Sequence, residues 1–170
     1  MTSKLFADPR EANLRSCVTM VEGVLQSLGH DPSHSRVAGK EELSPVWRVQ
    51  KGTAHVYVLM ETRGEETFLR IVAPVMHTDA KVDKPKLYQR LLELNHREIY
   101  GSAFALDDAR DLVVLVAERT TTDLDRSEVL DLVRRVEEYA DRYDDILVDE
   151  FGGNKAGPSS LPLPGTTPVS

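Results

Sequence analysis

Apolar residues at helical spacing predict three helices in this chain. The first begins near Pro9, which suits the first turn of a helix. Its apolar residues recur three or four positions apart: Leu14, Cys17, Val18, Val21, Leu25 and Leu28. A second helix is predicted over Lys84–Arg97 and a third over Arg126–Glu150. Asp125 and Glu128 have the spacing of a capping box at the start of the third helix.

Shorter apolar runs between these helices predict five strands. The strands are Val46–Gln50, Thr53–Glu61, Thr67–Pro74, Ser102–Leu106 and Leu112–Glu118. In Thr53–Glu61 both alternating sets of residues are largely apolar. We therefore expect this strand at the centre of a sheet, with helices on one face and a partner as the candidate cover of the other.

The order of elements is α-β-β-β-α-β-β-α, and its short connections favour antiparallel pairing. We predict an α+β fold with a five-stranded antiparallel sheet and helices packed on it. The chain of 170 residues has the length of one domain. We place that domain at residues 1–151 and a flexible tail at residues 152–170, which hold four of the nine prolines, four of the ten glycines and one charged residue.

The net charge of −7 comes from one segment of the chain. Asp123–Glu150 contains eleven acidic and four basic residues, and the rest of the chain contains seventeen of each. An acidic protein has no electrostatic attraction to nucleic acid or to anionic membranes. The acidic helix is either a solvated face or a surface that steers basic partners toward the protein.

The sequence predicts a cytoplasmic protein. The longest apolar run, Leu112–Ala117, is far shorter than the roughly 20 residues that span a bilayer. Residues 1–8 have no apolar stretch typical of a secretory signal. The single cysteine, Cys17, allows no disulfide within the chain. It lies on the apolar stripe of the first helix, so we predict that it is a core residue.

The motifs of common active sites are missing from the sequence. There is no nucleophile elbow of the G-x-S-x-G type and no glycine-rich phosphate loop. His30 and His34 have the spacing of a zinc pair on a helix, but Pro32 between them breaks such a helix. We therefore predict a protein without catalytic residues, cofactor or metal.

Three segments together resemble the YbjN family of bacterial proteins. They are Leu87–Asn95, Gly101–Leu106 and Leu112–Val116, and the resemblance extends over residues 10–150. In that family a helix ending in Leu-Asn precedes a strand that has a small residue before an aromatic one, and Leu94-Asn95 and Ala103-Phe104 match this pattern. The family is similar in fold to the chaperones of type III secretion, with the same order of elements.

The resemblance implies a non-catalytic homodimer that binds a segment of another protein, with a role in stress response or regulation. The candidate partner-binding residues are the aromatics of the predicted strands: Trp47, Tyr57, Phe68 and Phe104. Trp47 lies on a predicted edge strand and is either an anchor for a partner or a core residue. The candidate dimer interface is the apolar side of the second helix: Leu87, Leu91 and Leu94. The alternative function is a small-molecule-sensing regulator with a pocket between the sheet and the first helix.

Overall fold

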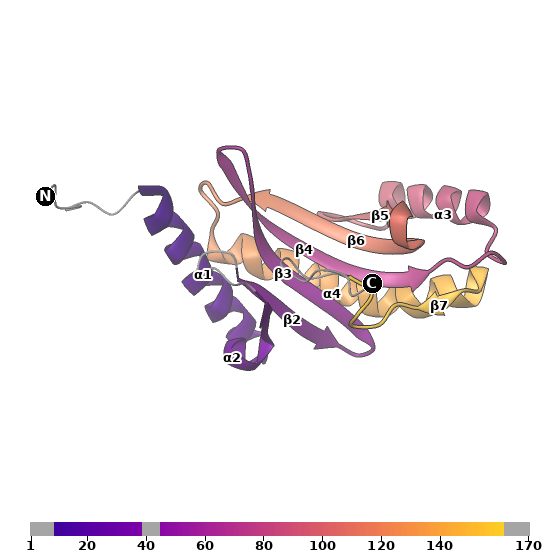
Figure 1. The fold of residues 1–170 in the computed structure, drawn as a ribbon, viewed down its shortest axis with the longest axis horizontal. Helices are drawn as coiled ribbons and strands as arrows, with labels where there is room; N and C mark the ends of the chain where they lie inside the picture. Colours follow the sequence, from indigo (N-terminus) through magenta and orange to yellow (C-terminus); the bar gives the residue numbers. More distant parts are fainter. Residues whose placement is uncertain (1–8, 39–44, 162–170) are drawn as a thin grey trace, which may run out of the picture.

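The computed structural model describes residues 9–38 and 45–161 and contains one antiparallel sheet (Figure 1). The strands are β1 (Arg36–Ala38), β2 (Val46–Lys51), β3 (Ala54–Arg63), β4 (Glu66–His77), β5 (Ala103–Asp107), β6 (Leu112–Thr120) and β7 (Asn154–Lys155). Their order is β1-β2-β3-β4-β6-β5, and β7 pairs with the end of β4. The helices are α1 (Pro9–Ser27), α2 (Pro32–Ser35), α3 (Lys84–Arg97) and α4 (Arg126–Phe151), with a short 3₁₀ turn, η1 (Asp108–Arg110).

The long helices α1, α3 and α4 share one hydrophobic core with one face of the sheet. Figure 1 shows α4 running behind the sheet along its length. The inner side of α4 is apolar at helical spacing, and its buried apolar residues include Val129, Val133, Val136, Ala140, Tyr143 and Leu147. They recur three or four positions apart, so the orientation of the helix follows from this periodicity.

Glycine sets the two tight turns of the β2–β3–β4 meander. Both loops have two residues, and each begins with a glycine of positive φ, Gly52 at 54° and Gly64 at 62°. A positive φ at the first loop position gives a hairpin the twist of its strands, and glycine adopts it without a steric penalty.

The predicted α+β class and antiparallel sheet are confirmed, and the structure adds two short strands to the predicted five. One is β1, which pairs with the outer side of β2 at Val46 and Trp47. It follows α2, a single turn capped by the Asp31 side chain, which accepts a hydrogen bond from the backbone N–H of Ser33 at 2.9 Å. A three-residue strand is too short for its alternation to be recognised in the sequence.

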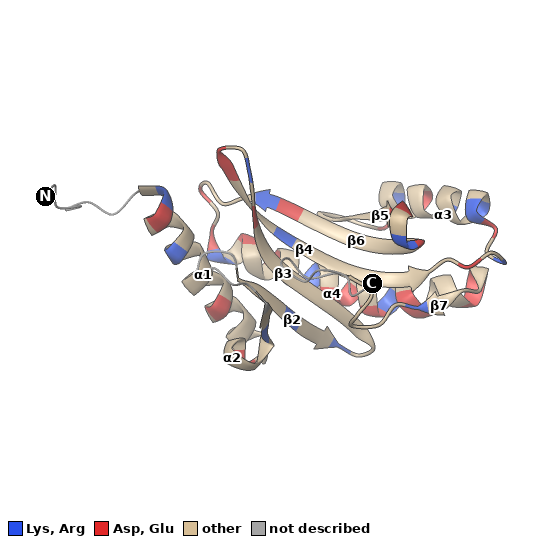
Figure 2. Ribbon diagram, viewed as in Figure 1, with Lys and Arg blue, Asp and Glu red and all other residues tan. Residues whose placement is uncertain are grey.

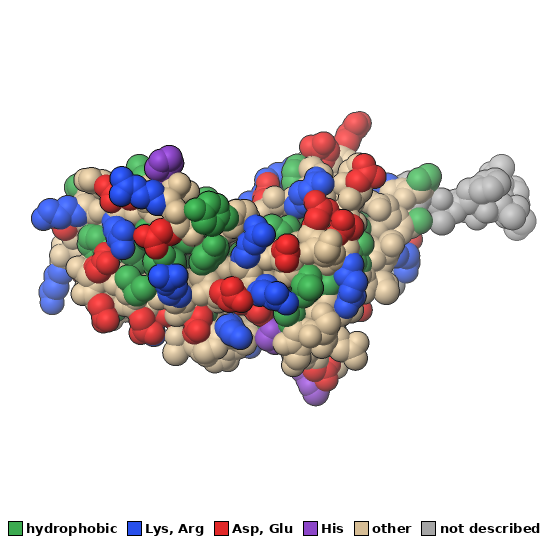
Figure 3. Space-filling model, turned by 180° about the vertical axis from the view of Figure 1, so that it is seen from behind, with side chains coloured by type: hydrophobic (Ala, Val, Ile, Leu, Met, Phe, Trp, Pro, Cys, Tyr) green, Lys and Arg blue, Asp and Glu red, His purple; other side chains and the backbone are tan. Residues whose placement is uncertain are grey.

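Two carboxylates of the acidic helix α4 are buried. Glu137 pairs with His30 (Nε2 to Oε1, 2.7 Å), and burial raises the pKa of the Glu137 carboxyl. Asp144 accepts a hydrogen bond from the Thr53 hydroxyl at 2.6 Å. On the outside of the helical layer, acidic and basic side chains alternate (Figure 3). Glu137 and Asp144 therefore connect α4 to other parts of the chain, and exposed acidic side chains of this layer lie among Lys and Arg side chains.

The first ten residues of the predicted tail lie against the sheet. β7 takes the place beside β4 that is left free beyond the start of β3, pairing Lys155 with Met76 and Asn154 with His77. The segment then continues to Leu161, which packs on the sheet. Residues 162–170 lie outside the described part of the chain, and the boundary of the domain stays a prediction.

Two kinds of feature are absent from the described part of the chain. None of the helices within residues 9–38 and 45–161 has the length and hydrophobicity that a bilayer crossing requires. In the same ranges, no three His, Cys, Asp or Glu side chains lie together as a metal site would need. His34, the other member of the predicted histidine pair, lies 3.1 Å from Asp31 at the surface.

Candidate functional site

The face of the sheet opposite the long helices, which we call the open face, is apolar at its centre. β3 and β6 carry apolar side chains on both of their faces, so half of these side chains point away from the helices. Figure 2 shows that charged residues are concentrated toward the strand ends and the connecting loops, leaving the middle of the sheet largely uncharged. An apolar sheet face of this kind is a surface that another element can cover.

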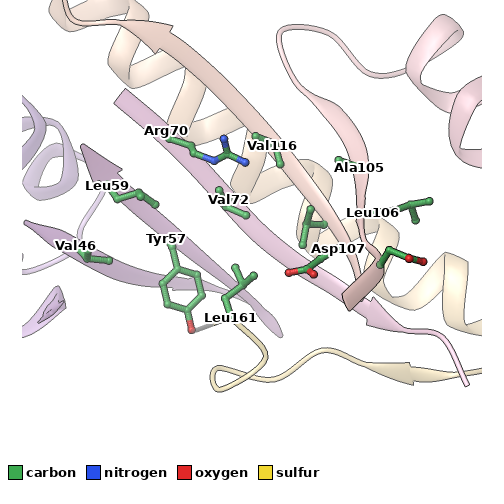
Figure 4. A pocket seen from close by; sticks show the side chains of 12 residues that line it. Val46, Tyr57, Leu59, Arg70, Val72, Ala105, Leu106, Asp107, Val116 and Leu161 are labelled. Carbon is green, nitrogen blue, oxygen red and sulfur yellow. The ribbon is translucent and has the colours of Figure 1, made fainter. Parts of the chain in front are cut away.

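A groove of about 420 Å³ crosses the open face (Figure 4). Its lining comes from strands β2 to β6 and from the C-terminal segment: Val46, Tyr57, Leu59, Arg70, Val72, Ala105, Leu106, Asp107, Asp108, Val114, Val116 and Leu161. Eight of these twelve residues are aliphatic, and Leu59 and Val116 are half-buried in its floor. The groove offers apolar contact area with polar groups only at its margins, as ligand sites in proteins commonly do.

An ion-pair cluster closes one end of the groove. Glu118 accepts hydrogen bonds from Arg63 at 2.8 Å and from Arg70 at 2.9 Å. Arg63 also pairs with Glu61 at 2.9 Å, and this hydrogen bond lowers the pKa of the Glu61 carboxyl. Both arginines are paired with glutamates, so the charges at this end of the open face cancel.

The C-terminal segment of the chain already occupies one side of the groove. Leu161 is half-buried and packs on the apolar cluster that contains Val72 and Val114, and Figure 4 shows its side chain pointing toward the Tyr57 ring. The Tyr57 hydroxyl donates a hydrogen bond to the carbonyl oxygen of Pro158. Burial raises the pKa of the Tyr57 phenol, which keeps it protonated and able to donate.

The outer edge of β5 is partly blocked by a side chain. Asn95 of α3 accepts a hydrogen bond from the Phe104 N–H at 2.7 Å and donates one to the Phe104 carbonyl at 3.2 Å. Both backbone groups of Phe104 therefore point away from β6, and Asn95 takes the place of a neighbouring strand. By the alternation of an antiparallel ladder, the next outward-pointing backbone groups on β5 are those of Leu106.

We expect Asn95→Ala to lower the free energy of unfolding by about 1–3 kcal/mol, since it removes two hydrogen bonds and leaves the Phe104 edge unpaired. Asn95→Asp keeps the acceptor for the Phe104 N–H but sets a carboxylate oxygen against the Phe104 carbonyl oxygen, so it should also destabilise the fold. Urea denaturation monitored by circular dichroism measures both. A change within about 0.3 kcal/mol for the alanine variant would show that this clamp does not stabilise the fold.

A second apolar surface lies between α3 and β5, next to the groove, with which it shares Ala105 and Leu106. Three large hydrophobic side chains are exposed among the described residues: Leu92 (69%) on α3, Tyr100 (63%) in the connection between α3 and β5, and Leu106 (44%) on β5. Leu92 and Leu106 line a hollow of about 290 Å³ that also includes Tyr88 and Phe104. We call this the α3–β5 patch; patches of this kind mark interfaces more often than isolated exposed residues do.

The four aromatics predicted as partner-binding residues do not form one surface. Trp47 and Phe104 face the helices, where Trp47 is fully buried and Phe104 packs edge-on against Tyr143 at 5.6 Å. Tyr57 and Phe68 are on the other side of the sheet. Tyr57 lines the groove, whereas Phe68 lies under the Arg63 guanidinium, 5.2 Å from its ring centroid. Only Tyr57 of the four therefore contributes to the groove.

The predicted dimer-interface residues are also on the inner side of their helix. Leu87, Leu91 and Leu94 are 0%, 4% and 0% exposed and pack against the chain's own core. Leu87 and Leu94 are fully enclosed, Leu91 lines the hollow between α3 and β5, and the outward-facing apolar residue of α3 is Leu92. Neither of the two hollows described above lies between the sheet and the first helix, where the sequence predicted a pocket.

Comparison with known proteins adds a family and a fold. Residues 15–158 match the model of the TY-Chap1 family, described as "T3SS (YopN, CesT) and YbjN peptide-binding chaperone 1". No curated protein matches the chain. A chain of the ExsC–ExsE complex is similar in structure, with a TM-score of 0.55, 14% identity, and coverage of 84% of this chain and 97% of that one. A chain of the HopA1–SchA chaperone–effector complex has a TM-score of 0.56 at 14% identity, covering 82% and 99%. At this identity the two complexes show a shared fold.

Proposed function

Because the chain belongs to the TY-Chap1 family of peptide-binding chaperones, we propose that it is a non-catalytic protein-binding module that takes an extended segment of a partner protein on its open face. One observation carries this proposal: the chain's own Leu161 lies in the groove, anchored on apolar residues of the sheet. A partner segment with apolar side chains would use the same contacts.

The groove favours a partner of a particular chemistry. Its floor is aliphatic, and its two margins carry the neutralised Arg70–Glu118 pair and the carboxylates of Asp107 and Asp108. A segment with apolar residues at alternate positions would place one set of side chains on the aliphatic floor and the other set in solvent. Burial of the apolar set supplies the affinity, at about 25 cal/mol for each Å² removed from water.

A peptide selection tests this proposal. Random displayed peptides of about 12 residues, close to 40 Å when extended, are selected on the full-length protein and their affinities measured by fluorescence anisotropy. We expect enriched peptides with apolar residues at alternate positions. Failure to enrich any sequence, or enriched peptides that bind equally well after the groove is altered, would contradict the proposal.

We further propose that the protein forms a homodimer through the α3–β5 patch. The support is the exposure of Leu92, Tyr100 and Leu106 together with the outward-pointing backbone of Leu106 at the sheet edge. A two-fold dimer buries the same patch on both copies. An exposed apolar surface beside an open strand edge therefore suits pairing with its own copy.

Leu92→Asp is expected to convert the dimer to a monomer, because it places two like charges at a two-fold interface. Sedimentation at micromolar concentration should give twice the 19.0 kDa chain mass for the wild type and 19.0 kDa for the variant. Glu93→Ala, on the same helix, serves as a neutral control that should leave the dimer intact. A wild-type protein that sediments at 19.0 kDa would exclude this dimer.

A further inference from the structure

The segment after α4 crosses the sheet in two stages, and the first is strand addition. β7 pairs with the last residues of β4, and the backbone N–H of Ala156 donates to the Val75 carbonyl at 3.1 Å. Ala156 itself is buried and belongs to the apolar cluster of the open face. The segment is thus held at its start by main-chain hydrogen bonds, which do not depend on sequence.

The second stage places side chains and carbonyls on the open face. Besides the Tyr57–Pro158 hydrogen bond, the Ser160 hydroxyl lies 2.8 Å from His77 Nε2 and accepts the backbone N–H of Gly157 at 3.0 Å. Leu161 then enters the groove. None of residues 156–161 has a charged side chain, so the segment that reaches the groove is uncharged, as the groove floor is.

One ion-pair group fixes the segment before it turns onto the open face. The Lys155 ammonium lies 2.5 Å from Asp145, 3.5 Å from the buried Asp144 and 3.2 Å from the Thr53 hydroxyl. The hydrogen bond with Asp145 raises the pKa of Lys155, so the cation persists through the physiological range. Because Asp145 is largely exposed, this group is weak and sensitive to salt.

We propose that residues 156–161 are an intramolecular competitor for the groove, which a partner segment must displace. The inference rests on the proposed function, and in it a segment of the same chain regulates the binding of a partner peptide to the groove. Together with β7, which precedes it, the segment uses the two modes expected of a partner, strand addition at a sheet margin and an apolar anchor. It is covalently attached, so its effective concentration at the groove is in the millimolar range, and even weak contacts compete with a bound peptide.

Leu161→Asp tests the competition in the full-length protein. An aspartate does not bury in the apolar groove, so the segment loses its anchor, and selected peptides should bind about three- to ten-fold more tightly, as expected for the loss of a half-buried leucine. Leu161→Met is the matched control, since it keeps an apolar anchor and should leave the affinity unchanged. Equal or weaker peptide binding by Leu161→Asp would overturn the proposal.

A second measurement separates this inference from the proposed function. A synthetic peptide of residues 154–161 is titrated at millimolar concentration into the Leu161→Asp variant, and the methyl resonances of Leu59, Val72 and Val116 are followed by NMR. We expect shifts of these resonances, and none at the exposed Leu92 methyls. Their absence would overturn the inference whether or not a partner peptide is found, whereas failure of the selection alone would count only against the proposed function.

Discussion

Trp47→Ala is expected to lower the free energy of unfolding by about 3–5 kcal/mol. Trp47 is fully buried between the sheet and the helices, and its truncation would leave a cavity in the core that these elements share. For a domain of ordinary stability this is a large fraction of the total. Urea denaturation of the purified variant measures the loss.

Trp47→Phe distinguishes packing from hydrogen bonding at this position. The Trp47 indole N–H is buried without a hydrogen-bond partner among the described residues, which costs about 1–3 kcal/mol. Phenylalanine removes that unpaired group and keeps most of the volume, so the variant should be much less destabilised than Trp47→Ala. If Trp47→Ala left stability within about 1 kcal/mol of the wild type but abolished peptide binding, Trp47 would be an anchor for a partner and its assignment to the core would be wrong.

Leu59→Asp is expected to weaken the binding of selected peptides by about 2 kcal/mol or more, roughly thirty-fold. The reason is that a carboxylate in the centre of the groove must lose its hydration when a peptide covers it. The loss of stability should be smaller than for a core residue, because Leu59 is half-buried and its side chain already lies partly in solvent. Fluorescence anisotropy with the selected peptides measures the change.

Leu92→Asp is the matched control for the groove variant. It introduces the same charge at an exposed leucine of the α3–β5 patch, on a different part of the molecule. The two variants should have opposite phenotypes: loss of peptide binding with the dimer retained for Leu59→Asp, and loss of the dimer with binding retained for Leu92→Asp. Peptide binding that depended on Leu92 and not on Leu59 would move the binding site to the α3–β5 patch.

Much of the open face was foreseeable from continuous apolar runs. The prediction that Thr53–Glu61 is apolar on both faces placed a central strand correctly, and the structure puts β3 between β2 and β4. The run Leu112–Ala117 carries the same signal, and its outward members Val114 and Val116 line the groove. A strand with apolar residues on both faces needs a cover on both, and the long helices within residues 9–38 and 45–161 cover only one.

The individual site residues were less predictable, because composition does not say which face of a strand a residue occupies. A register shift by one residue exchanges the two faces, and the pairing that decides between them is not local in sequence. Trp47 and Phe104 therefore could not be separated from Tyr57 by residue type. On α3 the sequence pattern predicts a buried side made of leucines. Leu87, Leu91 and Leu94 do face the core, but Leu92, from the same run, is 69% exposed, so its assignment to the buried side was wrong.

The contacts of the C-terminal segment with the sheet could not be predicted, for a different reason. Residues 152–161 are rich in glycine and proline, which is the composition of flexible segments, yet their contacts are made by backbone groups and by single side chains. Main-chain hydrogen bonds leave no pattern in the sequence. The Leu94-Asn95 and Phe104 pairing is the opposite case: the residues that carried the family resemblance form a specific hydrogen-bonded clamp.

The position of a bound peptide tests most directly whether the open face is the binding site. Methyl NMR of the full-length protein with a selected peptide identifies the leucine and valine methyl groups that are in contact with it. We expect intermolecular NOEs to Leu59, Val72 and Val116 and loss of the contacts of Leu161 with the sheet. Intermolecular NOEs confined to Leu92, with Leu161 still in place, would contradict the assignment of the open face as the binding site.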